Sequence, residues 1–202
     1  MKPRKILFLG ETFRADAQTW MNGLVEHGNF EFVTWELNQF GTSFKRFLRH
    51  FEFLWAPIAI RILIAKEKPD MIIAERTTSY GFLAAASGVR PVAIAQQGIT
   101  DIYPLDSPLL PLKEFLQKYA FKKATLIHAW GPAMATNIAK KITDMSKVMV
   151  MPKGIDLSFF AFDDNDSRYA KKIRGIVTRS LLPDYRHVVI INACSILKRK
   201  GY

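Results

Sequence analysis

Short apolar runs alternate with amphipathic stretches along most of this chain. The apolar runs are each about one strand long and cover residues 5–10, 30–35, 71–74, 91–95, 125–129 and 147–151. Between them, hydrophobic residues at three- and four-residue steps predict helices over residues 16–27, 43–66, 80–87, 111–122 and 132–141. Apolar strands separated by helices predict an α/β domain whose sheet is mostly parallel, with helices on both faces.

The longest predicted helix, residues 43–66, carries its large hydrophobic residues on one side. Pro57 within it predicts a kink or a split into two helices. Two interpretations of the stretch from Phe44 to Arg61 stay open. It is either a domain helix whose basic face is in solvent, or a helix that lies on a membrane surface. The hydrophobic side consists of Phe44, Phe47, Leu48, Phe51, Trp55, Ile58 and Ile62.

The composition changes after residue 162. Residues 163–186 are polar and charged, and they predict a linker with one helix over residues 169–182. A new apolar run, residues 187–192, predicts a strand, and a lone strand cannot bury both of its faces. We therefore expect a domain over residues 1–162, a linker over 163–186, and the first strand and loop of a truncated second domain over 187–202.

The amino-acid composition favours a class of binding partner but does not identify a single partner. The 202 residues are 49% hydrophobic, enough for one full core. The net charge of +11 favours anionic partners such as a membrane surface, a nucleic acid or a phosphorylated substrate. No nucleic-acid-binding module is recognisable, so we expect no nucleic acid partner. The single cysteine, Cys194, fits a reducing compartment. We expect a cytoplasmic protein, peripheral at the inner membrane face if the membrane interpretation holds.

Three segments near the end of the chain resemble the interdomain region of family-four glycosyltransferases. Residues 149–160 read Met-Val-Met-Pro-Lys-Gly-Ile-Asp-Leu-Ser-Phe-Phe. They are similar to the family signature, in which a strand ends in Pro-Asn-Gly-Ile/Val-Asp and a Phe follows, with Lys153 in place of the Asn. Residues 123–130 resemble the strand that precedes the signature. Residues 189–201 resemble the first strand and loop of the donor domain.

The resemblance implies the GT-B arrangement, in which two Rossmann-like domains face each other across a cleft. The N-terminal domain holds the acceptor and the C-terminal domain holds the nucleotide-sugar. It further implies transfer of a sugar to a glycan or lipid-linked acceptor, with retention, in polysaccharide or lipid-sugar assembly. No cofactor and no metal are implied, because the nucleotide-sugar is itself the substrate. Two alternatives stay open: a degenerate half that binds glycan, membrane or a partner subunit without catalysis, and a GT-B sugar epimerase.

The candidate site residues follow the predicted strands, because ligands of open α/β sheets bind at the carboxyl ends of the strands. Gly10 begins a strand-to-helix turn whose helix amides could bind a donor phosphate. Glu11 and Arg14 in the same turn are candidates for acceptor binding. Glu75 could accept from sugar hydroxyls at the reacting centre, and Arg76 could pair with a phosphate or hold the acceptor. Glu75 and Arg76 could equally form a solvated ion pair.

Four further candidates rest on the resemblance. Gln97 and Gly98 stand in the family's active-site loop, where His-Gly is frequent. An amide can hold a hydroxyl but cannot act as a general base. Lys200 matches the lysine that neutralises the leaving diphosphate, and Ser195 stands where an arginine usually meets that group. The four histidines have no ligand spacing, so no metal site is expected.

Overall fold

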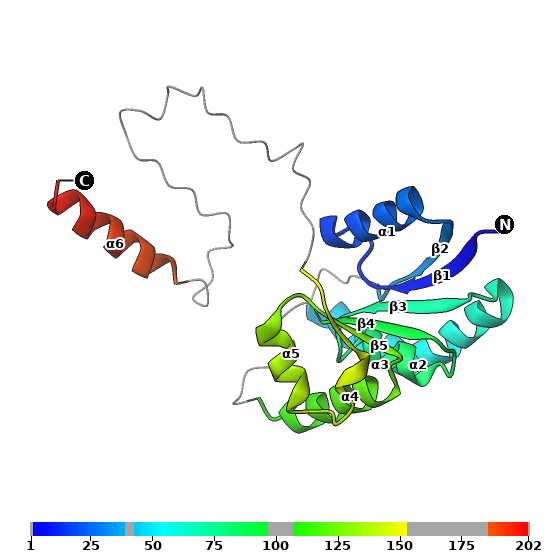
Figure 1. Cartoon of the computed structure of the whole chain (residues 1–202). Helices are drawn as coiled ribbons and strands as arrows, with labels where there is room; N and C mark the ends of the chain where they lie inside the picture. Colours follow the sequence, from blue (N-terminus) through cyan, green and yellow to red (C-terminus); the bar gives the residue numbers. More distant parts are fainter. Residues whose placement is uncertain (1, 39–42, 97–106, 153–185, 202) are drawn as a thin grey trace. The chain divides into compact units, whose positions relative to one another are not determined.

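One parallel sheet forms the centre of the first part of the chain. The structure is a computed structural model that describes residues 2–38, 43–96, 107–152 and 186–201. The chain divides into two units, residues 1–154 and 155–202. In the first unit six strands, all parallel, follow the order β2-β1-β3-β4-β5-β6 (Figure 1). They are β1 (Arg4–Leu9), β2 (Phe30–Trp35), β3 (Met71–Glu75), β4 (Val92–Gln96), β5 (Leu126–Ala129) and β6 (Val148–Val150).

Helices connect the strands and cover both faces of the sheet, which confirms the predicted α/β fold. Every helix and strand predicted before residue 152 is present, with ends that differ by at most a few residues. The helices are α1 (Ala15–His27), α2 (Ser43–Glu67), α3 (Tyr80–Ala86), α4 (Leu110–Lys123), α5 (Pro132–Ala139) and the short 3-10 helix η1 (Met145–Lys147). Pro132 takes the predicted place in the first turn of α5, where its missing N–H costs nothing.

The predicted split of the long helix at Pro57 is wrong. The helix α2 runs without interruption through Pro57. Ala56 and Ile60, on either side of the proline, are both fully buried in the core. We attribute the continuity to this packing, because burial of the two flanking turns offsets the one backbone hydrogen bond that proline removes.

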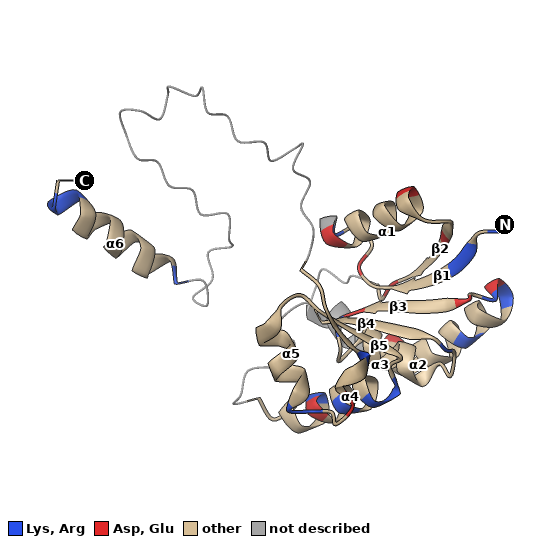
Figure 2. Cartoon of the chain, viewed as in Figure 1, with Lys and Arg blue, Asp and Glu red and all other residues tan. Residues whose placement is uncertain are grey.

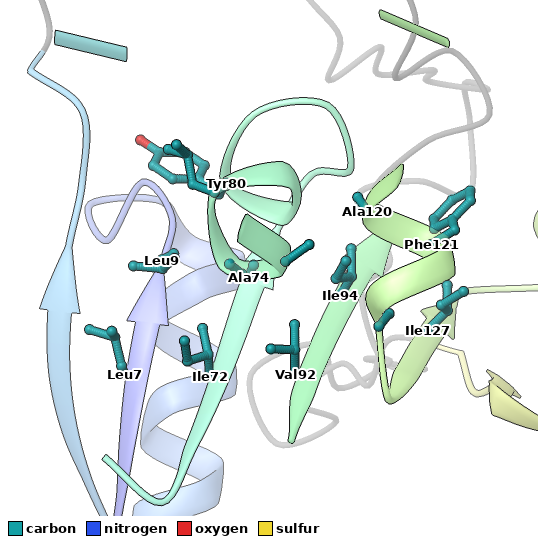
Figure 3. Packing of buried hydrophobic residues seen from close by; sticks show 14 of the residues in the cluster. Leu7, Leu9, Ile72, Ala74, Tyr80, Val92, Ile94, Ala120, Phe121 and Ile127 are labelled. Carbon is teal, nitrogen blue, oxygen red and sulfur yellow. The ribbon is translucent and has the colours of Figure 1, made fainter. Parts of the chain in front are cut away.

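The two faces of the sheet pack against different helices. Because successive side chains of a strand point to opposite faces, alternate residues enter two separate cores. One core joins the sheet to α2, α3, α4 and α5, and its centre is drawn in Figure 3. The other joins Ile6, Phe8 and Ile73 to Ala17 and its neighbours on α1. The first core contains Leu7, Leu9, Ile72, Ala74, Tyr80, Val92, Ile94, Ala120, Phe121 and Ile127.

The predicted strand over residues 187–192 is wrong. In the second unit the structure describes a helix, α6 (His187–Arg199), whose residues are all exposed or nearly so. A strand needs a neighbour for its backbone N–H and C=O groups, whereas a helix satisfies them internally. No described residue of the second unit forms a strand beside it, so the helix is favoured. The predicted linker helix at 169–182 and the predicted boundary at 162 lie outside the described residues.

Candidate functional site at the carboxyl ends of β1 and β3

The strand order changes direction between β1 and β3. From β1 the chain moves outward to β2, then returns to the other side of β1 and continues through β3, β4, β5 and β6. In open α/β sheets such a switch point leaves a crevice at the carboxyl ends of the two strands, and ligands bind there. Here the residues that follow these strands are Gly10 and Glu11 after β1, and Arg76 after β3.

Glu11 binds two arginines at this edge. Arg76 donates two hydrogen bonds to it, from Nη1 to Oε1 at 3.0 Å and from Nη2 to Oε2 at 2.7 Å. Arg14 donates from Nε to the same Oε2. Burial alone would raise the pKa of Glu11, but the Arg14 hydrogen bond and the charges of both arginines outweigh it and lower this pKa. Glu11 is therefore ionised at neutral pH and fixes both guanidinium groups.

Glu75, the last residue of β3, has the opposite environment. Its side chain is buried, with the residue only 3% exposed. Arg76 and Arg14 attract its charge, yet no hydrogen bond or ion pair joins its carboxylate to another described residue. Burial, with repulsion from Asp16 as the next largest cause, raises the pKa of Glu75 to about 7. Glu11 and Glu75 are thus two carboxyl groups at one edge with pKa values pushed apart, a common arrangement in acid–base sites.

Gly10 leaves space for the Glu75 side chain. A Cβ placed on Gly10 would lie 2.9 Å from Oε2 of Glu75 and 2.8 Å from Cε1 of Phe8. The φ of Gly10 lies outside the left-handed region, so close approach and not backbone freedom requires glycine here. The sequence pattern explains the glycine at position 10 by a turn that binds a phosphate. The structure offers a second explanation, which is the Glu75 carboxylate packed against it.

Arg76 adopts a left-handed backbone conformation, with φ of 63°. This conformation is uncommon for residues with a side chain and costs on the order of 1 kcal/mol or more. Two backbone hydrogen bonds hold it: Arg76 N–H donates to the Ala95 carbonyl at 3.0 Å, and Gly81 N–H donates to the Arg76 carbonyl at 2.8 Å. The backbone thereby directs the guanidinium of Arg76 back over the end of β1 to Glu11.

A row of paired residues extends the site across the sheet. Glu75 pairs with Ala95 of β4, and Ala95 pairs with His128 of β5. Paired residues of parallel strands share a face, so Glu75 and His128 both lie on the face covered by α1, with Cα atoms roughly 10 Å apart. Trp20 of α1 stacks on the His128 ring, with ring centroids 5.0 Å apart.

His128 has one ring nitrogen bonded and one unsatisfied. Its Nε2 lies 2.7 Å from the Met151 carbonyl oxygen. Because a carbonyl oxygen only accepts, Nε2 carries the proton in the neutral ring, and Nδ1 is left as an acceptor. No described residue donates to this buried Nδ1. The sequence contained one signal for His128, which is its position near the carboxyl end of a predicted strand. It was not singled out because the four histidines were considered only as metal ligands, and their spacing does not fit a metal site.

The structure brings five of the nine predicted site residues together. These are Gly10, Glu11, Arg14, Glu75 and Arg76. The interpretation of Glu75 and Arg76 as an ion pair with each other is wrong, because Arg76 pairs with Glu11 instead. Gln97 and Gly98 lie outside the described residues. Ser195 and Lys200 lie in and just after α6, in the second unit, so the predicted strand and donor loop around them are not present. Asp16, which sequence analysis did not single out, stands beside Glu75.

A cavity of about 480 Å³ lies elsewhere, at the amino ends of the strands, between the last turns of α4 and the segment after α5. Lys147 caps α4 there, donating from Nζ to the carbonyls of Phe121 and Lys122 at 3.3 and 3.2 Å. The position and the basic lining separate this cavity from the carboxyl-edge site. Its lining includes Lys118, Lys122, Lys140, Lys141 and Lys147, and Figure 2 shows several of the basic residues (blue) on α4.

Comparison with known sequences places the chain in a family. Residues 28–130, about half of the chain, match the family described as glycosyl transferase 4-like. The chain belongs to the glycosyl transferase 4-like family. The matched range includes β3, Glu75 and Arg76, and it confirms the family that the sequence resembles; of the three resembling segments it contains residues 123–130. No protein with a curated description matches the sequence.

Several solved structures share this fold, and their titles name UDP, UDP-GlcNAc or UDP-GlcNAc 2-epimerase. An S. aureus MnaA structure with UDP superposes with a TM-score of 0.56 at 17% identity, over 82% of this glycosyl transferase 4-like chain and 49% of that one. A Methanocaldococcus jannaschii UDP-GlcNAc 2-epimerase, solved with UDP-GlcNAc and UDP, gives 0.52 at 15% identity, over 73% and 46%. The Neisseria meningitidis UDP-GlcNAc 2-epimerase bound to UDP-GlcNAc gives 0.53 at 14%, over 74% and 45%. The chain spans about half the length of these structures, and the likeness shows the fold.

Proposed function

We propose that this chain is the acceptor-side half of a glycosyltransferase, which moves a sugar from a nucleotide-sugar to a glycan or lipid-linked acceptor. The family membership supports sugar transfer. The UDP and UDP-GlcNAc named in the titles of the structures with the same fold support a nucleotide-sugar donor. The resemblance to retaining enzymes supports retention. One observation carries the assignment of the site: the charged cluster stands at the switch point between β1 and β3.

The charges of this edge suit sugar hydroxyls better than a diphosphate. Glu11 neutralises one of its two arginines, and Asp16 stands at the start of α1, where an anion would otherwise bind. Figure 2 shows acidic (red) and basic (blue) residues side by side at the start of α1. The carboxylates of Glu11 and Asp16 would repel a diphosphate bound at this edge. Sugar hydroxyl groups can instead donate hydrogen bonds to these carboxylates. We therefore assign this edge to the sugar or acceptor. Gly10 has the role of leaving the space that the Glu75 side chain occupies.

Glu75 supplies the reactive group of the proposed site. With a pKa of about 7, its carboxyl is present in both protonation states near neutral pH. Such a group can accept a proton from an acceptor hydroxyl or donate one to a sugar oxygen. The resemblance gives roles to four further residues: Gln97 and Gly98 would act at the reacting centre, and Ser195 and Lys200 would serve the donor phosphates.

Ligand-observed NMR tests the site directly. In a saturation-transfer experiment with UDP-N-acetylglucosamine, the proposal predicts stronger saturation of the sugar protons than of the uracil protons. Arg76→Ala and Glu75→Ala should each reduce the sugar signal several-fold. Arg90→Ala, an exposed arginine at the opposite ends of the strands, is the matched control and should leave it unchanged. Sugar signals that persist in both site variants would contradict the assignment.

A second candidate reaction is epimerisation of a nucleotide-sugar. The near-neutral pKa of Glu75 favours it, because a carboxyl that exchanges a proton easily is also what proton abstraction from a sugar carbon requires. Incubation with UDP-N-acetylglucosamine in D₂O separates the two reactions. Deuterium on a ring carbon of the recovered sugar would favour epimerisation, and sugar transfer to an added glycan would favour the transferase. Binding without either reaction would favour the non-catalytic alternative.

A further inference from the structure

The outward side of α2 is a stripe of large hydrophobic side chains. Leu48, Phe51, Leu54, Trp55, Ile58 and Ile62 are each between 44 and 74% exposed. Five of them follow one another at steps of three, four, three and four residues, so they lie along one side of the helix. We call these six residues the α2 stripe. With Leu54 included, the stripe and its exposed neighbours occupy an arc of roughly 140° at 100° per residue.

The core does not need the α2 stripe. The opposite side of the helix packs inward through the buried Ala56 and Ile60, with Phe53, Leu63 and Ile64 partly buried against the same core. Phe53 also stacks on Phe82 of α3, with ring centroids 6.1 Å apart. The large hydrophobic residues that the sequence pattern marks as one face are therefore mostly on the exposed side of the helix, and a different set of residues packs against the core. Monomeric proteins rarely expose such a contiguous apolar surface without a use.

The charges along α2 indicate what covers the stripe. The helix α2, Ser43–Glu67, contains five lysine or arginine residues and two acidic residues, Glu52 and Glu67. Glu52 is engaged by Asn38, which donates to it from the backbone N–H at 3.0 Å and from Nδ2 at 2.8 Å. Arg61 is exposed at the border of the stripe. The Lys66 side chain at its end is 77% exposed and lies 3.7 Å from the carboxylate of Glu67, so its charge is partly balanced within the helix. An anionic surface complements this helix, and an acidic lipid headgroup layer is such a surface.

The breadth of the stripe also favours a bilayer over a single partner helix. A coiled-coil seam needs only a narrow stripe at the three- and four-residue steps. Leu54 and the exposed Ala65 widen this one beyond a seam. Phe51 and Trp55 are aromatic residues of the kind that lie at the level of lipid headgroups. No described helix is long and apolar enough to cross a membrane, so the contact would be a surface one.

We propose that the α2 stripe docks this chain onto the surface of an anionic lipid bilayer, with the stripe inserted among the headgroups and Arg61 facing acidic lipids. This inference goes beyond the proposed sugar chemistry and does not depend on it.

Vesicle binding with an internal fluorescent reporter tests the proposal. Trp55 is 61% exposed, and the other three tryptophans are partly buried, so Trp55 should dominate any change in emission. Vesicles of mixed phosphatidylglycerol and phosphatidylcholine should bind the chain and shift its emission to shorter wavelength. Phosphatidylcholine vesicles should bind at least tenfold less. Higher salt should weaken binding to the anionic vesicles, because it screens the headgroup charge.

Two variants and one control decide the outcome. The double variant Phe51→Glu with Trp55→Glu should lower the fraction bound to anionic vesicles at least tenfold. Trp55→Phe should bind normally but lose the emission shift. Val25→Glu, which adds the same charge at an exposed apolar position on α1, should bind normally. Far-UV circular dichroism checks that each variant folds.

Three results would overturn the proposal. The first is absence of binding of the unaltered chain to anionic vesicles. The second is equal binding of the Phe51→Glu, Trp55→Glu double variant and the unaltered chain. The third is a stable dimer of the unaltered chain that the double variant abolishes, since a second copy would then cover the stripe. Saturation transfer from UDP-N-acetylglucosamine should be the same in the double variant as in the unaltered chain, so failure here is distinguishable from failure of the proposed function.

Discussion

The carboxylate of Glu75 lies where residue 10 would carry a side chain, with its Oε2 2.9 Å from the position of a Cβ on Gly10. Gly10 directly follows β1, and Glu75 is the last residue of the neighbouring strand β3, at the switch point of the sheet. Gly10 therefore determines where the near-neutral carboxyl of Glu75 stands.

Replacing Gly10 by alanine should displace the Glu75 carboxylate and the ring of Phe8. We expect the free energy of unfolding to fall by about 1 to 3 kcal/mol, the usual cost of overpacking. Denaturant unfolding of the variant measures it. Adding Glu75→Ala to Gly10→Ala should recover part of the loss, because one of the two crowded groups is then gone.

The matched control for this change is Gly23→Ala, within α1. A Cβ on Gly23 meets no atom within 4 Å, so alanine should stabilise the helix by about 0.5 to 1 kcal/mol. A similar loss of stability at positions 10 and 23 would show that close approach to Glu75 is not what Gly10 provides.

Glu75 should make stability depend on pH. Its pKa of about 7 in the folded chain lies above the ordinary value of 4.5, so the folded state binds the proton more tightly than the unfolded state. The free energy of unfolding should therefore fall as pH rises from about 4.5 to 7. Glu75→Gln removes this cost and should be more stable than the unaltered chain by about 3 kcal/mol at pH 8, with little difference at pH 4.

Unfolding curves across pH 4–8 measure this difference. Glu26→Gln, at an exposed position of α1, is the control and should give a nearly constant difference. A Glu75→Gln variant less stable than the unaltered chain at pH 8 would mean that the carboxylate is held by favourable contacts, contrary to the burial described above.

A buried amide links the loop after Glu75 to α4. Gln117 is fully buried; its Nε2 donates to Thr77 Oγ1 at 2.8 Å, and its Oε1 accepts from Lys141. Gln117→Leu leaves Thr77 without that donor and Lys141 without this acceptor, so we expect a loss of about 2 to 3 kcal/mol in the free energy of unfolding. Gln18→Leu, exposed on α1, should change it by less than about 0.5 kcal/mol.

Periodicity was sufficient to predict the first unit because each strand and helix there has a local signature. The apolar run before Gly10 and the amphipathic run before Gly28 fix β1 and α1 without knowledge of the rest of the chain. The run at 187–192 has the same signature as a strand, but a strand also needs a neighbour. A pattern of residue types cannot report whether that neighbour is present, and α6 forms instead.

The sequence predicted the place of the site better than its contacts. That Glu11, Glu75 and Arg76 share an edge follows from the parallel sheet alone. That Arg76 pairs with Glu11 and not with its neighbour Glu75 depends on a left-handed backbone at Arg76, which no pattern of residue types reports. The outward orientation of the α2 stripe was hidden for a related reason: periodicity identifies an apolar side of a helix, but not whether the core or the surroundings cover it.

The protonation state of Glu75 can be followed by NMR with carbon-13 at the glutamate carboxyl groups. We expect this carboxyl to titrate near pH 7, Gly10→Ala to change its titration, and UDP-N-acetylglucosamine to shift its signal while the signal of Glu26 stays in place. If the Glu75 carboxyl titrates near its ordinary value of 4.5 and does not respond to the sugar nucleotide, Glu75 is not the reactive group of this site.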